Sequence, residues 1–586
     1  MSRKAWATRL LLWVALVPIL VTAVGRRDVP PACNDHSFVN VLPPNVSVEK
    51  VVFVESGNTY GEGLRNLNYP IQPTNLPDLC AVTIFVKFSS ASAYRFGLFL
   101  PVDWNNRILT YGNGGFGGGI NWLDMGAGVK YGFAAISTDT GHNSTSGDIS
   151  WALNNPETKT DWGWRSIHGS VEIGKKVVEA YYKKKIDYSY YSGCSTGGRQ
   201  GLKEVQISPE SFDGVLVGSA AWYTSHLNTW VSKVGTYNLP LTAPNHINAS
   251  LFPAMAKEVV RQCDRLDGVE DGIISAPDAC TPDYTVMACN RPGVNQSACL
   301  TAAQIATTAK AYGDYRAADG ALLYPGLSPG CEDQWALVLG QNMTSLYGLN
   351  YARYFLYDDP GWQWQDYNDS APAYAARTDP GRATADDYDL APFRDRGGKM
   401  IMYHGLADGL LPAKGSDLYW ERVVAATGGG NATATQQFFR YFTVPGMGHC
   451  GGTAVDAPWN FAAPFQAGTL GNDSWSVPGY RDARHDVLLA LMGWVENGTA
   501  VDAVVATTWD ASANASTPVR RQRPLCPYPA TARWDGEGEV NAAESWRCEG
   551  HASTGPEVPK SVAAKSVGYS WATAGALGSM ALSAVL

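Results

Sequence analysis

The sequence predicts an α/β fold, in which helices wrap a largely parallel sheet. Three observations lead to this prediction. Short buried-type strands alternate with helical stretches from about residue 80 to 220, strands return at about residue 399, and the 586 residues, 45% hydrophobic, suffice for a large core. From 225 to 395 the periodicity is poor, and Pro, Asp and aromatic residues dominate. We expect an inserted domain there, with the sheet built from 28–224 and 396–550.

The expected strands are short runs rich in Val, Ile, Phe and Tyr, and the expected helices repeat apolar residues every three or four positions. A glycine-rich loop, 112–119, follows the third strand. We find no internal repeat. The strands are expected at 81–86, 96–100, 107–111, 132–137, 188–192, 214–218, 399–403 and 438–444, and the helices at 170–184, 198–205 and 486–495.

The first chemical motif is the G-x-S-x-G run at 193–197, which lies between a predicted strand and a predicted helix. This context is what a nucleophile elbow requires, because the small flanking residues permit the strained turn that lifts a serine hydroxyl above the sheet. A glycine-rich turn without chemistry is the alternative. We predict that Ser195 is the nucleophile of an α/β-hydrolase fold with a large inserted domain.

A serine nucleophile needs a base, and the base needs a carboxylate that holds its tautomer. In this fold the order along the chain is Ser, then Asp or Glu, then His, each in a loop after a strand. Asp408 follows the strand 399–403, and His449 follows the strand 438–444. Each residue alone would be an ordinary loop residue, but their joint placement predicts a Ser195–His449–Asp408 triad.

Cysteines flank two members of this triad. Cys194 precedes Ser195 and Cys450 follows His449, so a folded triad brings the two sulfurs together and predicts a disulfide. The two oxyanion-hole donors are expected to be the backbone N–H of Thr196 and that of Gly114 in the glycine-rich loop. A merely flexible loop is the alternative reading of those glycines.

A second motif is the acidic run at 263–274, in which Asp264, Asp267 and Asp271 are interleaved with glycines. Several carboxylates at short, irregular spacing suit a hard cation such as Ca²⁺. The spacing is not that of an EF-hand, and ordinary Asp-Gly turns are the alternative.

The termini and the sequons predict an extracellular protein. Residues 1–23 have a charged start, an apolar run and small residues at the end, as in a signal peptide. The tail, 551–586, ends in an apolar stretch that resembles a GPI-anchor signal, with a disordered tail as the alternative. Asn-x-Ser/Thr sequons, predicted to be glycosylated, occur at Asn45, Asn143, Asn248, Asn295, Asn342, Asn368, Asn431, Asn472, Asn497 and Asn514.

Charge and cysteine content argue against two classes of protein, nucleic-acid binders and zinc proteins. The formal net charge is −9 and no Lys/Arg-rich block occurs, which argues against a nucleic-acid partner. The 11 cysteines include no C-x2-C pair, so disulfides are favoured over zinc, and the odd count leaves one thiol over.

The Cys-Ser, Asp and His-Cys pattern at 193–199, Asp408 and 449–450 resembles that of the tannase and feruloyl esterase family. The resemblance covers roughly residues 30 to 550. It implies an inserted lid that binds structural calcium through Asp264, Asp267 and Asp271, with carbonyls from Val269 and Ile273. It further implies the disulfides Cys33–Cys80, Cys263–Cys280, Cys289–Cys299 and Cys526–Cys548, with Cys331 left unpaired.

The resemblance implies a secreted carboxylic ester hydrolase that acts on small aromatic hydroxy-acid esters, either galloyl esters of tannins or feruloyl and coumaroyl esters of cell-wall sugars. A further cysteine pair near the N-terminus, frequent in the family, is missing. The alternatives are a peptidase or thioesterase on the same scaffold and a non-enzymatic hydrolase-like surface protein. Any membrane attachment would come from the GPI-like tail.

Overall fold

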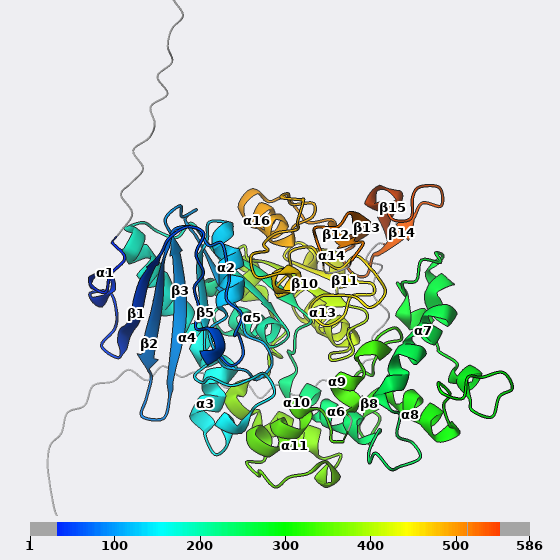
Figure 1. The fold of residues 1–586 in the computed structure, drawn as a ribbon. Helices are drawn as coiled ribbons and strands as arrows, with labels where there is room; N and C mark the ends of the chain where they lie inside the picture. The colour runs from blue at the N-terminus through cyan, green and yellow to red at the C-terminus, as the bar shows by residue number, and fades with distance from the viewer. Residues whose placement is uncertain (1–31, 341, 512–513, 551–586) are drawn as a thin grey trace, which may run out of the picture.

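The computed structural model describes residues 32–340, 342–511 and 514–550. The predicted signal peptide, 1–23, and the tail, 551–586, lie outside these residues. A nine-stranded sheet runs through the molecule in the order β1-β2-β3-β5-β4-β6-β7-β10-β11 (Figure 1). Its strands are β1 (Val46–Val54), β2 (Leu79–Lys87), β3 (Ala93–Pro101), β4 (Arg107–Tyr111), β5 (Ala134–Thr138), β6 (Tyr188–Cys194), β7 (Gly214–Gly218), β10 (Lys399–Gly405) and β11 (Phe439–Val444).

The sheet is mixed rather than wholly parallel. Strands β5, β4, β6, β7, β10 and β11 pair in parallel, whereas β1, β2, β3 and β5 pair antiparallel. The connection from β2 to β3 is short, which permits only an antiparallel pair. The sequence did not predict β1, because at this sheet edge exposed and buried positions follow no strict alternation. The observed sheet is that of an α/β-hydrolase.

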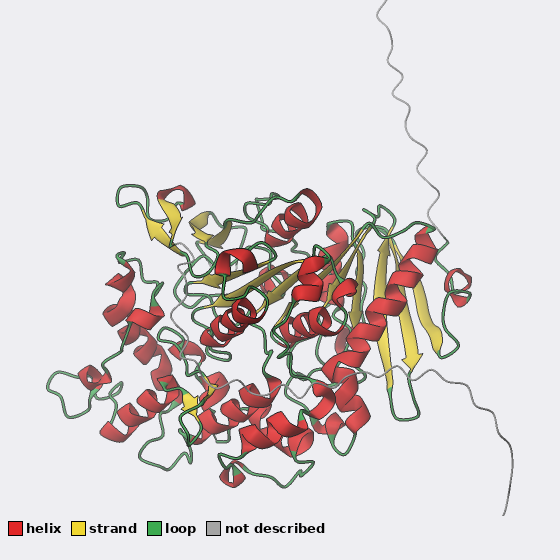
Figure 2. Ribbon diagram, turned by 180° about the vertical axis from the view of Figure 1, so that it is seen from behind, coloured by secondary structure: helices red, strands yellow, loops and turns green. Residues whose placement is uncertain are grey.

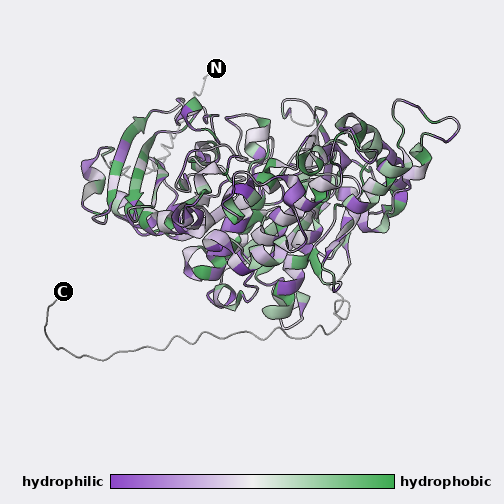
Figure 3. Ribbon diagram, turned by 90° about the horizontal axis from the view of Figure 1, so that it is seen from below, coloured by the Kyte–Doolittle hydropathy of each residue, from purple (hydrophilic) through white to green (hydrophobic). Residues whose placement is uncertain are grey.

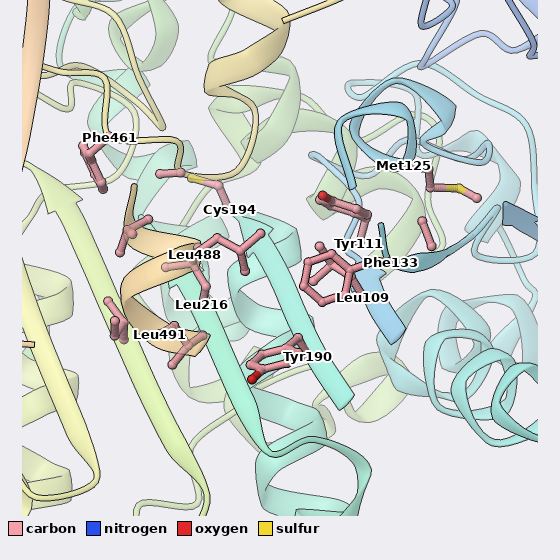
Figure 4. Packing of buried hydrophobic residues seen from close by; sticks show 14 of the residues in the cluster. Leu109, Tyr111, Met125, Phe133, Tyr190, Cys194, Leu216, Phe461, Leu488 and Leu491 are labelled. Carbon is pink, nitrogen blue, oxygen red and sulfur yellow. The ribbon is translucent and has the colours of Figure 1, made fainter. Parts of the chain in front are cut away.

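Helices cover both faces of the sheet, as Figure 2 shows from behind. On one face lie α2 (Trp122–Lys130) and α16 (Val487–Asn497), and on the other lie α4 (Ser166–Tyr182), α5 (Thr196–Ile207) and α13 (Lys414–Ala426). Figure 4 shows Leu488 and Leu491 of α16 packed toward Leu216 of β7. Neighbouring strand residues face opposite layers, so that Tyr190 joins one core and Tyr191 the other.

The chain between β7 and β10, hereafter the inserted segment, builds a second core beside the sheet. This core gathers Trp230, Phe252 and Trp335, and it also receives Leu410 and Leu411 from the loop after β10. The segment contains α6 (Thr224–Thr236), α7 (Phe252–Cys263), α8 (Ala302–Tyr312), β8 (Tyr315–Arg316), β9 (Leu322–Tyr324), α9 (Ala336–Leu339), α10 (Leu346–Asn350), α11 (Ala371–Thr378) and α12 (Ala391–Asp395).

The C-terminal part adds two hairpins, β12 (Val504–Trp509) with β13 (Val519–Leu525) and β14 (Thr531–Trp534) with β15 (Trp546–Glu549). In Figure 3 hydrophobic green is prominent on strands of the large sheet, while many helices show both colours. No helix in the described part of the chain is long and apolar enough to cross a bilayer. Short helices complete the fold: α1 (His36–Val39), α3 (Pro156–Thr160), α14 (Ala432–Thr435) and α15 (Gln466–Leu470).

Candidate active site

Ser195 occupies the sharp turn between β6 and α5. Its backbone has φ 61° and ψ −122°, a conformation that a non-glycine residue adopts only at a cost of about 1–3 kcal/mol. A Cβ on Gly193 would lie 2.7 Å from the Gly197 carbonyl, and one on Gly198 would lie 2.7 Å from the Gly218 oxygen. The glycines of the motif are therefore required by close packing, as a nucleophile elbow demands.

Asp408 and His449 meet at the carboxyl ends of β10 and β11. His449 Nδ1 lies 2.7 Å from Asp408 Oδ2. A carboxylate can only accept here, so Nδ1 carries the proton and Nε2 is left as the basic nitrogen. The other carboxylate oxygen, Oδ1, accepts the N–H groups of Leu410 and Leu411, each at 2.9 Å. The carboxylate is thus fully held before any substrate arrives.

A second histidine, His404, approaches the same carboxylate and was not singled out from the sequence. Its Nε2 lies 3.1 Å from Asp408 Oδ2 and 2.9 Å from the Leu411 carbonyl, so this nitrogen is a donor. Its Nδ1 contacts Ser416 Oγ at 2.7 Å. Burial alone would raise the pKa of Asp408, but the charges and hydrogen bonds of His449 and His404 hold that pKa well below its usual range.

Cys194 and Cys450 form a disulfide, with their Cα atoms 6.0 Å apart. The bond links the residue before the nucleophile to the residue after the base, 256 positions away. It therefore fixes the separation of the loops that carry Ser195 and His449. Within the described residues no hydrogen bond joins Ser195 Oγ to His449, and in free enzymes such catalytic contacts are often long.

Ser195 and His449 open onto one cavity of about 360 Å³. This volume is that of a small-molecule site. Side chains of the inserted segment close one wall, and aromatic rings from the sheet side and the inserted segment form much of the rest. The lining residues include Tyr69, Phe116, Trp162, Ser195, Thr196, Thr224, Leu227, Asn228, Val231, Tyr347, His449 and Phe465, with no Asp or Glu among them.

The two expected oxyanion donors differ in their availability. Thr196 is the first residue of α5, so its N–H has no carbonyl acceptor within the helix and lies at the positive end of the helix dipole. The Gly114 N–H, by contrast, donates to the Tyr69 hydroxyl at 2.7 Å. Gly114 does line the cavity, but its amide is occupied by a side chain from a distant loop, which the sequence pattern did not reveal.

Arg199, one turn after the nucleophile, is a fully buried cation in the cavity wall. It donates to the Trp162, Gly163 and Ala383 carbonyls, and its guanidinium stacks 4.2 Å from the Trp162 ring. It forms no ion pair with any described residue, and burial lowers the pKa of Arg199 to about 10. The wall beside Ser195 is consequently electropositive.

The acidic loop after α7 closes on itself. Asp264 Oδ1 accepts the N–H groups of Asp271 and Gly272, and Asp267 Oδ1 accepts that of Val269. Asp271 Oδ1 accepts the Ile273 N–H, and its Oδ2 forms a buried ion pair with Arg523 at 2.6 Å. Among the described residues no three His, Cys, Asp or Glu side chains gather so as to hold a metal ion. As placed, these residues do not form a ligand set, and calcium binding stays a prediction.

The remaining cysteines pair as Cys33–Cys80, Cys263–Cys280, Cys289–Cys299 and Cys526–Cys548. Cys331 is a buried free thiol that accepts the Trp335 indole N–H at 3.3 Å. All ten sequon asparagines are exposed, which leaves each accessible to a glycan.

Comparison with known proteins agrees with this geometry. The family described as "Tannase and feruloyl esterase" matches residues 80–353 and 373–549. A probable feruloyl esterase B-2 of Aspergillus terreus is 35% identical over 543 residues, which cover 91% of this chain and 98% of that protein. The crystal structure of feruloyl esterase B from Aspergillus oryzae superposes with a TM-score of 0.79 at 30% identity, covering 87% of this chain and 98% of that one.

A tannin acyl hydrolase from Aspergillus niger shares the fold, with a TM-score of 0.67 at 21% identity over 89% of this chain and 95% of that one. The family match spans most of the sequence, on both sides of the nucleophile and through the inserted segment. The chain therefore belongs to the tannase and feruloyl esterase family and is a carboxylic ester hydrolase.

Proposed function

We propose that the protein hydrolyses esters of aromatic hydroxy acids through an acyl-enzyme on Ser195. The observation that carries the proposal is the single aromatic-walled cavity lined by both Ser195 and His449, with Asp408 bonded behind the base. His449 Nε2 takes the proton of Ser195 Oγ as this oxygen attacks the ester carbonyl, and the Thr196 N–H stabilises the oxyanion. The alcohol leaves with that proton, and water then releases the acid by the same steps.

We propose hydroxycinnamates, such as ferulate and p-coumarate, as the preferred acyl groups. Two proteins named feruloyl esterase are 35% and 30% identical to this chain, whereas the tannin acyl hydrolase is 21% identical. The cavity wall is compatible with this preference, because apolar side chains such as Phe116, Leu227 and Val231 can pack along an acyl group, and polar ones such as Thr224 and Asn228 can meet its phenolic hydroxyl. An elongated, mostly apolar acyl group fits such a wall.

A hydrolysis panel of methyl ferulate, methyl p-coumarate, methyl caffeate and methyl gallate tests this proposal. We expect kcat/KM to be highest for the first two and lowest for gallate. Ser195→Ala should lose several orders of magnitude in kcat, and a serine-directed phosphonate should label only the wild type. Preferential cleavage of peptides or thioesters, or labelling at another residue, would refute the assignment.

We also propose that the protein is secreted and glycosylated. Five disulfides among the described residues suit an oxidising compartment, and ten exposed sequons suit passage through a glycosylating pathway. Peptide mapping of protein from the culture medium, before and after enzymatic deglycosylation, tests both statements. Unmodified asparagines at every sequon would contradict the second.

A further inference from the structure

We infer that Gln334, a residue of the inserted segment, is a positioning residue that holds the loop of the catalytic acid and the loop of the catalytic base in register. The inference rests on the proposed function, because it assigns Asp408 and His449 as that acid and base. Gln334 ends a short 3-10 turn, Glu332–Gln334, far in sequence from both loops.

Among the described residues, backbone hydrogen bonds join the two catalytic loops only at their beginnings. Beyond the parallel strands β10 and β11, the Leu406 N–H donates to the Val444 carbonyl at 2.9 Å, and the Ala407 N–H donates to the Met447 carbonyl at 3.0 Å. Farther along both loops, the Gln334 side chain joins them. Its Oε1 accepts the Gly409 N–H at 3.0 Å and the His449 N–H at 3.3 Å.

Both partners of this side chain are N–H donors, so the amide oxygen, rather than the nitrogen, must face them. One oxygen thus bridges the backbone of His449 and that of the residue after Asp408. The bridge keeps the 2.7 Å bond between Asp408 and His449 from depending on two separate loops.

Both loops have a glycine where Gln334 enters. A Cβ on Gly409 would lie 2.6 Å from Gln334 Cβ, and a Cβ on Gly448 would lie 2.2 Å from Gln334 Nε2. These distances are shorter than side chains tolerate, so the glycines leave the space that the glutamine occupies. The Gln334 side chain is therefore packed against a glycine of each catalytic loop.

The turn that presents Gln334 is itself fixed. Glu332 is fully buried and accepts the Gly330 N–H at 3.0 Å and the Tyr312 hydroxyl at 2.5 Å. Trp335, also fully buried, donates to Cys331 Sγ. Residues on either side of Gln334 are thus anchored at the second core, which fixes the backbone from which the glutamine side chain extends.

The consequence concerns kcat more than substrate affinity. In the described structure Gln334 does not line the 360 Å³ cavity, so its loss should leave binding nearly unchanged. A displacement of about 1 Å between catalytic groups can cost about 100-fold in rate. We expect the acid and base loops to drift by a fraction of that distance when the bridge is removed.

Two variants of the full-length enzyme distinguish the hydrogen-bonding role of the Gln334 side chain from its packing role. Gln334→Met keeps the length of the side chain and removes the acceptor, and kcat should fall about 10–100-fold with KM within about threefold. Gln334→Glu keeps the acceptor and should recover most of that loss. Its added negative charge favours the protonated imidazole, so the acid limb of its kcat/KM profile should move to higher pH. Asp333→Asn, at the exposed neighbouring position, is the matched control and should match the wild type.

The readouts are kcat and KM on the best methyl ester, the pH profile and the melting temperature. A Gln334→Met enzyme with wild-type kcat overturns the inference. So does a loss of kcat that Gln334→Glu fails to recover and that a fall in melting temperature accompanies, since that result describes a packing residue. An inactive wild type whose Ser195 resists a phosphonate would instead refute the proposed function.

Discussion

Asp408 lies between two imidazoles, since His449 and His404 both contact its Oδ2. Together they hold the pKa of Asp408 well below its ordinary value despite the burial that opposes them. The carboxylate is then ionised throughout the neutral range, and in the proposed mechanism its charge favours the imidazolium of His449 during acyl transfer. The sequence did not indicate a functional role for His404, because a histidine at this position of β10 looks like an ordinary buried residue of a strand.

Glu332 gives a pH prediction at the same scale. Burial raises the pKa of Glu332 to about 7, above the value of about 4.3 for an unfolded chain. The folded state therefore holds a proton that the unfolded state releases, and this contribution to stability is full below about pH 4.3 and is lost as pH rises through 7.

Glu332→Gln should remove this dependence, because an amide oxygen can still accept from Gly330 and Tyr312 but does not titrate. From pH 4 to 8 the free energy of unfolding should fall less for the variant than for the wild type, by on the order of 1–3 kcal/mol. Denaturant titrations across this range measure the difference. Exposed Glu270→Gln is the control, and parallel curves for Glu332→Gln and the wild type would refute the prediction.

At the scale of the elements, removal of the Cys194–Cys450 disulfide tests its role in positioning the proposed triad. The double variant Cys194→Ser/Cys450→Ser should keep its fold but lose stability of about 2–4 kcal/mol and about 100-fold in kcat, because the bond both closes a long loop and sets the spacing of nucleophile and base. Cys289→Ser/Cys299→Ser, which opens a short loop of the inserted segment, is the matched control and should change kcat little. Equal kcat in both double variants would show that the bond has no positioning role.

The acidic loop after α7 offers arginines and backbone amides as an alternative to calcium, so the calcium prediction needs a direct test. Its carboxylates are held by backbone amides and by Arg523, and Arg533 and Arg521 donate to the Asp267 and Asp271 carbonyls. We still expect chelation to lower the melting temperature and Asp267→Ala to abolish that sensitivity. Calcium-free protein whose melting curve ignores both chelator and added Ca²⁺ would show that the arginines alone close the loop.

The sequence predicted elements best where one pattern was repeated without interruption. Strands β4 and β7 agree with their predicted bounds, and α5 extends the predicted helix by two residues at each end. The first strand, β1, was missed because it lies at a sheet edge with no strict alternation. Helix α13 was missed because Gly415, Ser416 and several charged residues interrupt its apolar spacing.

At the scale of the whole molecule, the candidate triad could be proposed from the sequence because each member follows a strand of one sheet. The contacts of Gln334 and Tyr69 could not, because these residues come from distant parts of the chain. Gln334 lies 75 residues from Gly409 and 115 from His449, and Tyr69 lies 45 residues from Gly114. No local period or motif reports such a contact, which is created only when distant segments of the chain fold together.

The tail gives a prediction for the complete chain, although residues 551–586 lie outside the described structure. If the apolar end directs GPI attachment, deleting 551–586 should move the enzyme from the cell surface into the medium. The catalytic residues and both cores lie before residue 551, so kcat/KM should be unchanged. Assaying cell-bound and released activity, with and without phosphatidylinositol-specific phospholipase C, measures the outcome. Equal release of the full-length and truncated enzymes into the medium would show that the tail does not direct membrane attachment.

The packing of Leu410 and Leu411 bears on how such enzymes could be recombined. These residues follow the catalytic acid, yet their side chains belong to the core of the inserted segment. A chimera that exchanges only the chain between β7 and β10 would bring a foreign core against a resident acid loop. The interchangeable module is therefore the inserted segment together with β10 and residues 406–411, and specificity transplants between relatives should be cut after residue 411 rather than before β10.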